Sequence, residues 1–160
     1  MNRVIDTREE EIELTKYSGA TADKLHHMAK YYIETNKPDN LIIVAGLNDI
    51  LNERRLNNGS ANCEEVADRV LSIGRTARAG GIGRICISQI LKPSFRDCHD
   101  NINDTNHILR SNCKSEAFIF ISQSNIGPHD LGDPLHVSDK GNDKLKHNIL
   151  SQCYTYDKSY

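Results

Sequence analysis

The stretch KPDNLIIVAGLNDI, residues 37–50, decides the fold. Its centre, LIIVA at 41–45, is an unbroken apolar run. A half-exposed strand alternates apolar and polar residues, so this run predicts a strand covered on both faces, as in a parallel sheet. Gly46 ends the strand, and Asn48 and Asp49 then place an amide and a carboxylate just beyond its carboxyl end.

Three other segments predict strands, and helical patterns separate them. The segments are EIELTKY at 11–17, RICISQIL at 84–91 and AFIFIS at 117–122. The apolar spacing predicts helices from Thr21 to about 36, from Asn62 to Gly80, from about 100 to 113 and after Ser138. Strands that alternate with helices predict an α/β fold, a three-layer α/β/α sandwich around a flavodoxin-like parallel sheet.

Two of these helices carry signals for their ends. Thr21 is placed to cap the first, and Asn62 with Glu65 three residues later has the spacing of a capping box. Gly80 and Gly81 then end the second helix.

Composition describes one ordinary globular domain. The chain has 160 residues, with 20 Lys+Arg against 22 Asp+Glu and 38% hydrophobic residues, which disfavours both a disordered chain and a wholly basic nucleic-acid binder. We expect a single domain over 1–153 and a frayed tail over 154–160. Its apolar runs are far shorter than the ~20 residues of a membrane span, so no membrane partner is expected.

The five cysteines are widely spaced and form no C-x-x-C. This spacing argues against a zinc site and a disulfide framework, so we expect reduced thiols and an intracellular, cytoplasmic protein that needs no metal and no cofactor. The sequence leaves the oligomeric state open.

A candidate hydrolytic site combines four residues. Attack on an ester by a hydroxyl needs a base, an acid that orients the base, and donors for the developing oxyanion. His136 is the candidate base and Asp133 the acid. The backbone N–H of Gly19 and the side-chain amide of Asn48 are the candidate donors.

Each component also has a purely structural explanation. An isolated Asp133-x-x-His136 is more often an exposed helix start whose aspartate caps the helix. Gly19 suits a tight turn, and Asn48 with Asp49 suits an Asx turn at a strand end. Their joint occurrence after strands and before the last helix favours the site.

Three blocks resemble the SGNH, or GDSL-type, hydrolases, including the esterase-like domains of some animal LINE-type retrotransposons. The blocks are YSGATADKL at 17–25, KPDNLIIVAGLNDI at 37–50 and GDPLHVSDKGNDKL at 132–145, and the likeness spans about residues 10–150. It implies metal-free hydrolysis of acyl or acetyl esters by a Ser-His-Asp mechanism. It also implies an oxyanion hole at Gly19 and Asn48, with Gly46 and Asp49 in support.

The family's first block, a strand ending in Gly-Asp-Ser with the nucleophile, has no counterpart. Ser18 precedes the expected oxyanion glycine, and other serines such as Ser94 have no motif support. By the resemblance, MNRVIDTREE at 1–10 would be the remnant of the helix that follows the nucleophile. In the family's strand order, 2-1-3-4-5, the first strand lies between 11–17 and 41–45. We therefore expect these two flanking strands to pair directly, or the chain to be part of a longer protein.

The sequence thus predicts an ester hydrolase domain cut before its nucleophile and inactive or weakly active as it stands, acting on a small ester if active. A second hypothesis is a catalytically silent module of the same fold that binds RNA or protein. It rests on the stretch from Arg69 to Arg96, which contains no Asp or Glu and carries six cations: Arg69, Arg75, Arg78, Arg84, Lys92 and Arg96. No aromatic residues are interleaved for base stacking, so nucleic acid is the less favoured partner.

Overall fold

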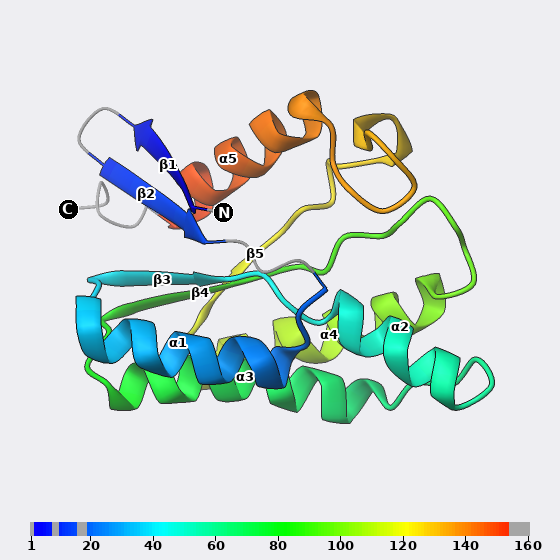
Figure 1. Cartoon of the computed structure of the whole chain (residues 1–160), viewed down its shortest axis with the longest axis horizontal. Coiled ribbons are helices and arrows are strands. Elements are labelled where there is room, and N and C mark those ends of the chain that lie inside the picture. Colours follow the sequence, from blue (N-terminus) through cyan, green and yellow to red (C-terminus); the bar gives the residue numbers. More distant parts are fainter. Residues whose placement is uncertain (1, 8–9, 16–18, 154–160) are drawn as a thin grey trace.

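The structure is a computed structural model that describes residues 2–7, 10–15 and 19–153. The elements are β1 (Asn2–Thr7), β2 (Glu10–Thr15), α1 (Ala22–Asn36), β3 (Asn40–Ile43), α2 (Leu47–Leu56), α3 (Cys63–Ala79), β4 (Arg84–Ser88), α4 (His99–Glu116), β5 (Ile119–Ile121), the 3-10 helix η1 (Pro128–Asp130) and α5 (Asp139–Cys153) (Figure 1).

A parallel sheet of β3, β4 and β5, in that order, forms the middle of the molecule. Leu41 lies opposite Ile85, and Cys86 lies opposite Ile119. The predicted strands at 41–45, 84–91 and 117–122 are confirmed in type and order, although each observed strand is shorter.

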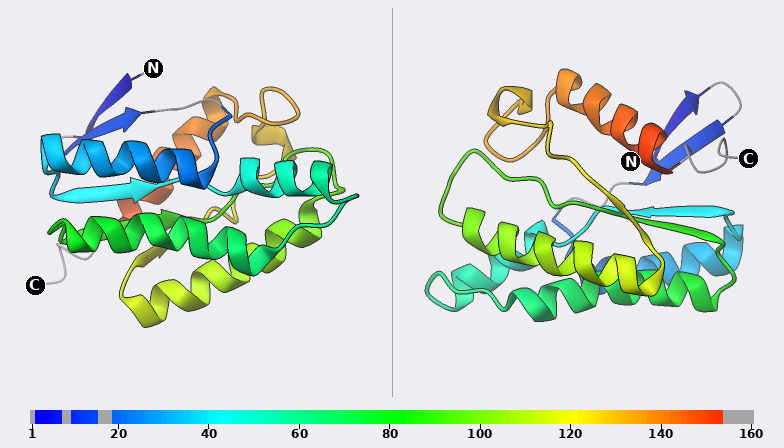
Figure 2. Two further views of the ribbon diagram at one scale, coloured as in Figure 1. Left: turned by 60° about the horizontal axis from the view of Figure 1, so that its bottom comes forward. Right: turned by 180° about the vertical axis from the view of Figure 1, so that it is seen from behind.

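Helices cover both faces of this sheet, which confirms the predicted α/β sandwich. α1, α3 and α4 lie on one side and α5 on the other (Figures 1 and 2). Successive strand residues point to opposite faces. Accordingly, Ile85 and Ile87 join the core beneath α3 and α4, while Cys86 joins the smaller core of Ile121 and Ile149 beneath α5.

The amino-terminal segment differs from the prediction. Residues 2–7 form strand β1 rather than the remnant of a helix, and β1 pairs antiparallel with β2. The segment predicted as a strand at 11–17 is a strand over 10–15, but it is not part of the parallel sheet. Pairing with a segment only a few residues away closes a shorter loop than pairing with β3, and so costs less conformational entropy.

β3 consequently has a free outer edge in the part of the chain that the structure describes. Its one strand partner there is β4, so the expected direct pairing of 11–17 with 41–45 is wrong. Val44, just beyond β3, is 56% exposed.

The two predicted helix starts behave differently. The side chain of Asn62 accepts a hydrogen bond from the backbone N–H of Glu65, as predicted. The reciprocal bond comes from elsewhere, because Glu53 on α2 accepts the backbone N–H of Asn62. Thr21 precedes α1, but its side chain makes no capping bond there.

α5 is attached to the chain beside it through a row of polar side chains. Gln152 exchanges two hydrogen bonds with the backbone of Ser122, at 2.6 and 2.9 Å. Asn148, one turn earlier and 5% exposed, donates to the side-chain oxygens of Gln123 and Asn125, each at 2.7 Å. These positions are four residues apart and therefore lie on one face of the helix.

All five cysteines are free thiols, and four of them are buried. None of the helices in the described part of the chain is long and apolar enough to cross a membrane. The expected tail at 154–160 lies outside the described residues.

The two helix starts give a paired test. Asn62→Ala should lower the free energy of unfolding by about 1 kcal/mol, because it removes a capping bond. Thr21→Ala should change it by less than about 0.5 kcal/mol, because no such bond is lost. Urea unfolding of both variants measures the difference, and equal losses would contradict the assignment.

Candidate active site

The predicted site residues lie at one end of the molecule. In a parallel sheet, the segments that follow the strands gather beyond their carboxyl ends. α2 follows β3 there, and the loop that precedes α5 lies at the same end in all three views of Figures 1 and 2. Asn48 is in the first turn of α2, and His136 is on the loop.

Asp133 and His136 are in direct contact. Nδ1 of His136 lies 3.0 and 3.1 Å from the two carboxylate oxygens of Asp133. The same carboxylate accepts the backbone N–H groups of Leu135 at 2.8 Å and of His136 at 2.7 Å. When Nδ1 donates to the carboxylate, Nε2 is left with its lone pair, which is the arrangement that a general base requires.

Hydrogen bonds keep Asp133 ionised. The two backbone N–H groups and then the imidazole of His136 hold the pKa of its carboxyl below the ordinary value of 3.8. Both side chains are about half exposed, at 53% for His136 and 54% for Asp133, so water and a substrate can reach them.

The Asp133–His136 pair stands on a closed loop. Leu131 and Val137 form an isolated antiparallel bridge, and the N–H of Gly132 donates to the carbonyl of His136 at 2.8 Å. The loop that follows β4 lies beside it, because the N–H of Ser94 donates to the carbonyl of Pro134 at 2.8 Å.

The two candidate oxyanion donors are also brought together. Nδ2 of Asn48 donates to the carbonyl of Ala20 at 3.0 Å, which places the amide beside the turn at Gly19. Because an amide nitrogen carries two hydrogens, one remains for a ligand. Gly19 is exposed and has φ +72°, a left-handed conformation that favours glycine.

Asp49 joins α2, which carries Asn48, to the start of α1, which follows the turn at Gly19. It is 3% exposed, and its carboxylate accepts the N–H of Ala22 at the start of α1 at 2.8 Å. Burial raises the pKa of Asp49, while the bond from Ala22 and the charge of Arg69, 3.6 Å away, oppose the rise. The Asx turn considered for Asn48 and Asp49 is instead the first turn of α2.

Gly46 is needed for close packing. It has φ +116°, and a Cβ there would lie 2.7 Å from Cδ1 of Ile90. Ile90 is itself fixed by Asn106 of α4, whose amide accepts its N–H at 2.7 Å and donates to its carbonyl at 3.0 Å. Sequence reasoning missed Asn106 and the role of Arg69, because neither belongs to a local pattern.

The structure therefore contains two clusters at one end, Asp133 with His136 and Gly19 with Asn48 and Asp49. No hydrogen bond joins the clusters within the described residues. No described serine hydroxyl hydrogen-bonds to His136, and Ser18 lies outside the described residues. The described residues include no group of three His, Cys, Asp or Glu side chains that could hold a metal ion.

A polar cavity lies elsewhere, between the start of β3 and the start of β4. Lys37, Asp39, Gly81 and Arg84 are among its lining residues. It is at the amino ends of the strands, opposite the edge where parallel sheets bind ligands, so the site described above does not include it.

Comparison with solved structures identifies the fold. A GDSL-like lipase from Bacteroides thetaiotaomicron VPI-5482 is similar, with a TM-score of 0.75 and 19% identity over 87% of this chain and 73% of that one. A member of the lipolytic protein G-D-S-L family from Veillonella parvula DSM 2008 has a TM-score of 0.67 and 14% identity, over 83% of this chain and 74% of that one.

The acetyl xylan esterase AlAXEase has a TM-score of 0.69 and 14% identity, over 86% of this chain and 78% of that one. No known sequence family and no curated protein matches this chain. At these identities the likeness concerns the fold, and the chain has the α/β fold of the GDSL-like hydrolases.

The lowered pKa of Asp133 can be measured directly. NMR of its carboxyl carbon should give a titration midpoint below 3.8. Because the folded pKa is the lower one, the linked stability is present above the unfolded pKa and is lost as pH falls through the folded pKa. His136→Ala should leave the midpoint below 3.8, because the backbone N–H groups contribute most. A midpoint at or above this value contradicts the geometry.

Asp49 gives a second test. Asp49→Asn keeps an oxygen for the N–H of Ala22 and removes a buried charge, so the free energy of unfolding at neutral pH should not fall. Asp49→Ala leaves that N–H unpaired and should cost about 1–3 kcal/mol. Glu65→Gln, at an exposed partner of Arg69, is the control. Equal costs for both Asp49 variants in urea unfolding would show that charge matters more than the hydrogen bond.

Proposed function

We propose that this chain is an SGNH-type ester hydrolase domain that supplies the base, its orienting acid and the oxyanion donors. The observation that carries the proposal is the contact of His136 Nδ1 with the Asp133 carboxylate, which leaves Nε2 for a proton. In this role His136 takes the proton of the attacking oxygen, and Asp133 stabilises the imidazolium that forms.

The oxyanion would be held by the other cluster. As the ester carbonyl becomes tetrahedral, its oxygen gains negative charge and needs donors fixed in advance. We assign this role to the N–H of Gly19 and to the second amide hydrogen of Asn48. The bonds from Asn48 to Ala20 and from Ala22 to Asp49 support the assignment, because they fix both groups relative to each other.

We further propose that the nucleophilic serine is not part of residues 1–160 and belongs to a strand that pairs with β3. The free outer edge of β3 within the described residues supports this, since a parallel strand there would end near α2 and the loop of His136. Without that serine the covalent route is closed, and the chain is inactive or weakly active through an attacking water.

The substrate that we propose is a small acyl or acetyl ester. The solved structures with this fold include an acetyl xylan esterase and a GDSL-like lipase, which supports ester chemistry in general. From the three sequence blocks at 17–25, 37–50 and 132–145, we propose that this chain is related to the esterase-like domains of retrotransposons. The free thiols favour a reducing compartment, and we propose the cytoplasm.

A silent module that binds RNA or protein is the alternative. Its cations are partly engaged within the molecule, because Arg69 pairs with Glu53 at 2.9 Å and Arg75 pairs with Glu116 at 2.7 Å. Charges already paired inside the protein are less available to phosphates, and this weakens the nucleic-acid hypothesis.

Hydrolysis of an aryl acetate tests the proposal. The chain should show a weak rate above buffer that falls at least about tenfold in His136→Ala, because a general base contributes that much or more. His147→Ala, at an exposed histidine of α5, is the matched control and should retain the rate. A serine-directed fluorophosphonate should label no serine within residues 1–160, because the proposed nucleophile is not among them.

Three results would contradict parts of the proposal. A rate that is unchanged in His136→Ala removes the base. Labelling of a serine within residues 1–160 removes the external nucleophile. Absence of turnover, together with tight RNA binding, supports the alternative.

A further inference from the structure

The segment that joins β5 to α5 carries a charged side chain that is completely buried. Asp130 ends η1, and its side chain is 0% exposed. Its Oδ2 accepts the N–H of Gly127 at 2.9 Å and the ammonium of Lys144 on α5, also at 2.9 Å. Lys144 reaches further, to the carbonyl of Asn125 at 3.2 Å. A carboxylate removed from water in this way requires its cation partner, so the two charges form one unit.

The backbone of Asp130 holds the start of α5. Its carbonyl accepts both the N–H of Ser138, at 2.7 Å, and the hydroxyl of Ser138, at 2.8 Å. The same hydroxyl accepts the N–H of Gly141 in the first turn at 3.2 Å. Gly141 packs against this carbonyl so closely that a Cβ there would collide with it. Asp130 therefore fixes α5 through its carboxylate and its carbonyl together.

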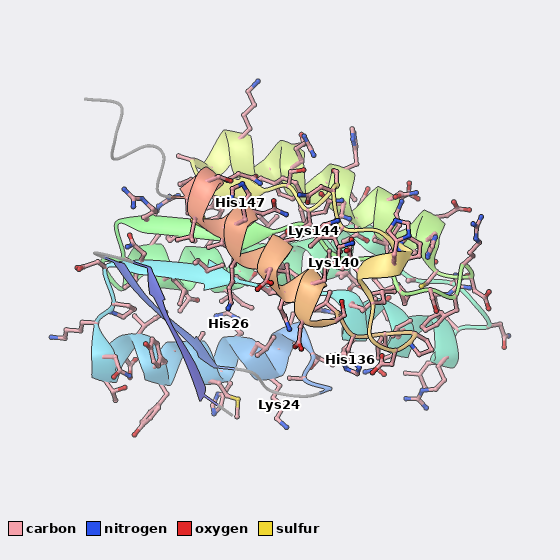
Figure 3. All side chains as sticks on the ribbon, turned by 90° about the horizontal axis from the view of Figure 1, so that it is seen from above. Lys24, His26, His136, Lys140, Lys144 and His147 are labelled. Carbon is pink, nitrogen blue, oxygen red and sulfur yellow. The ribbon has the colours of Figure 1, made fainter. Side chains whose placement is uncertain are left out.

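The loop with Asp133 and His136 lies between two anchors, Asp130 at its start and Ser138 at its end. It leaves the carboxylate-bearing residue Asp130 and returns at Ser138, which is bonded to the carbonyl of Asp130. Figure 3 shows His136 on this loop and Lys144 farther along α5. The bridge between Leu131 and Val137 closes the loop immediately beyond the anchors.

We infer that Asp130 and Lys144 are positioning residues for the Asp133–His136 pair. The inference rests on the proposed function, in which this pair is the base and its orienting acid. Neither Asp130 nor Lys144 bonds to His136. They hold the two ends of its loop at a fixed separation, and so set how the Asp133 carboxylate faces Leu135 and His136.

Two further observations fit this role. The N–H of Gly127 and the charge of Lys144 lower the pKa of Asp130, so the carboxylate stays charged while the loop works near neutral pH. Its other oxygen, Oδ1, has no hydrogen-bond partner within the described residues. A buried acceptor without a partner lowers the stability of the fold, and this one lies at the start of the loop that carries Asp133 and His136.

Amide hydrogen exchange tests the inference without requiring turnover. The N–H groups of Leu135 and His136, which donate to Asp133, report directly on the pair. In Asp130→Asn and in Lys144→Met, their exchange should become at least about tenfold faster relative to the amides of β4, because only the loop opens. Lys144→Arg keeps the charge and the donor and should restore slow exchange.

Lys146→Met is the matched control. Lys146 is on the same helix but two residues away, and hence on another face, so its removal should leave both amides unchanged. If a single variant does not fold, the double variant Asp130→Asn with Lys144→Gln replaces the buried ion pair with two neutral amides. Because the ion pair is lost, the N–H groups of Leu135 and His136 should also exchange faster in this variant.

The outcomes separate this inference from the proposed function. Unchanged exchange at Leu135 and His136 in folded variants overturns the positioning role, even if the protein hydrolyses esters. Exchange that rises equally in β4 overturns it as well, because the pair would then only stabilise the whole fold. Faster exchange confined to the loop supports the inference, even if the chain has no esterase activity.

Discussion

Parallel pairing of β3, β4 and β5 is the constraint on which the rest of the structure depends. A parallel strand can be reached only by a connection that crosses a face of the sheet, and these connections bring α3 and α4 onto one face. The segments beyond the carboxyl ends then gather at one edge. That is why α2, which carries Asn48, and the loop of His136 lie at the same end, although Asn48 and His136 are 88 positions apart in the chain.

The sequence predicted the features that depend on near neighbours or on burial. The apolar runs at 41–45, 84–91 and 117–122 gave the strands, because both faces of these strands are covered. The contact of Asp133 with His136 follows from three-residue spacing in a tight loop. Two errors concern the amino-terminal segment, where the sequence predicted a helix remnant at 1–10 and a direct pairing of 11–17 with 41–45. Residues 2–7 form a strand, and residues 10–15 pair with that strand instead of with β3.

Long-range polar contacts could not be predicted in the same way. Asp49 meets Ala22 27 positions away, and Asn106 meets Ile90 16 positions away. Asp130 and Lys144 are 14 apart. A single sequence gives no signal for such pairs, since an aspartate in a polar segment is usually on the surface. The long-range contacts around Asp49 and Asp130 are therefore visible only in three dimensions, whereas the pair Asp133 and His136 can be found in the sequence.

The polar row on α5 has a consequence for how that helix can sit. Apolar contacts alone specify the position of a helix along its axis only weakly, because one methyl group can replace another. Asn148 and Gln152, in contrast, each bond to particular donors and acceptors. Displacement of α5 by a single turn would break both sets together. The row therefore selects one axial position of α5 along the sheet.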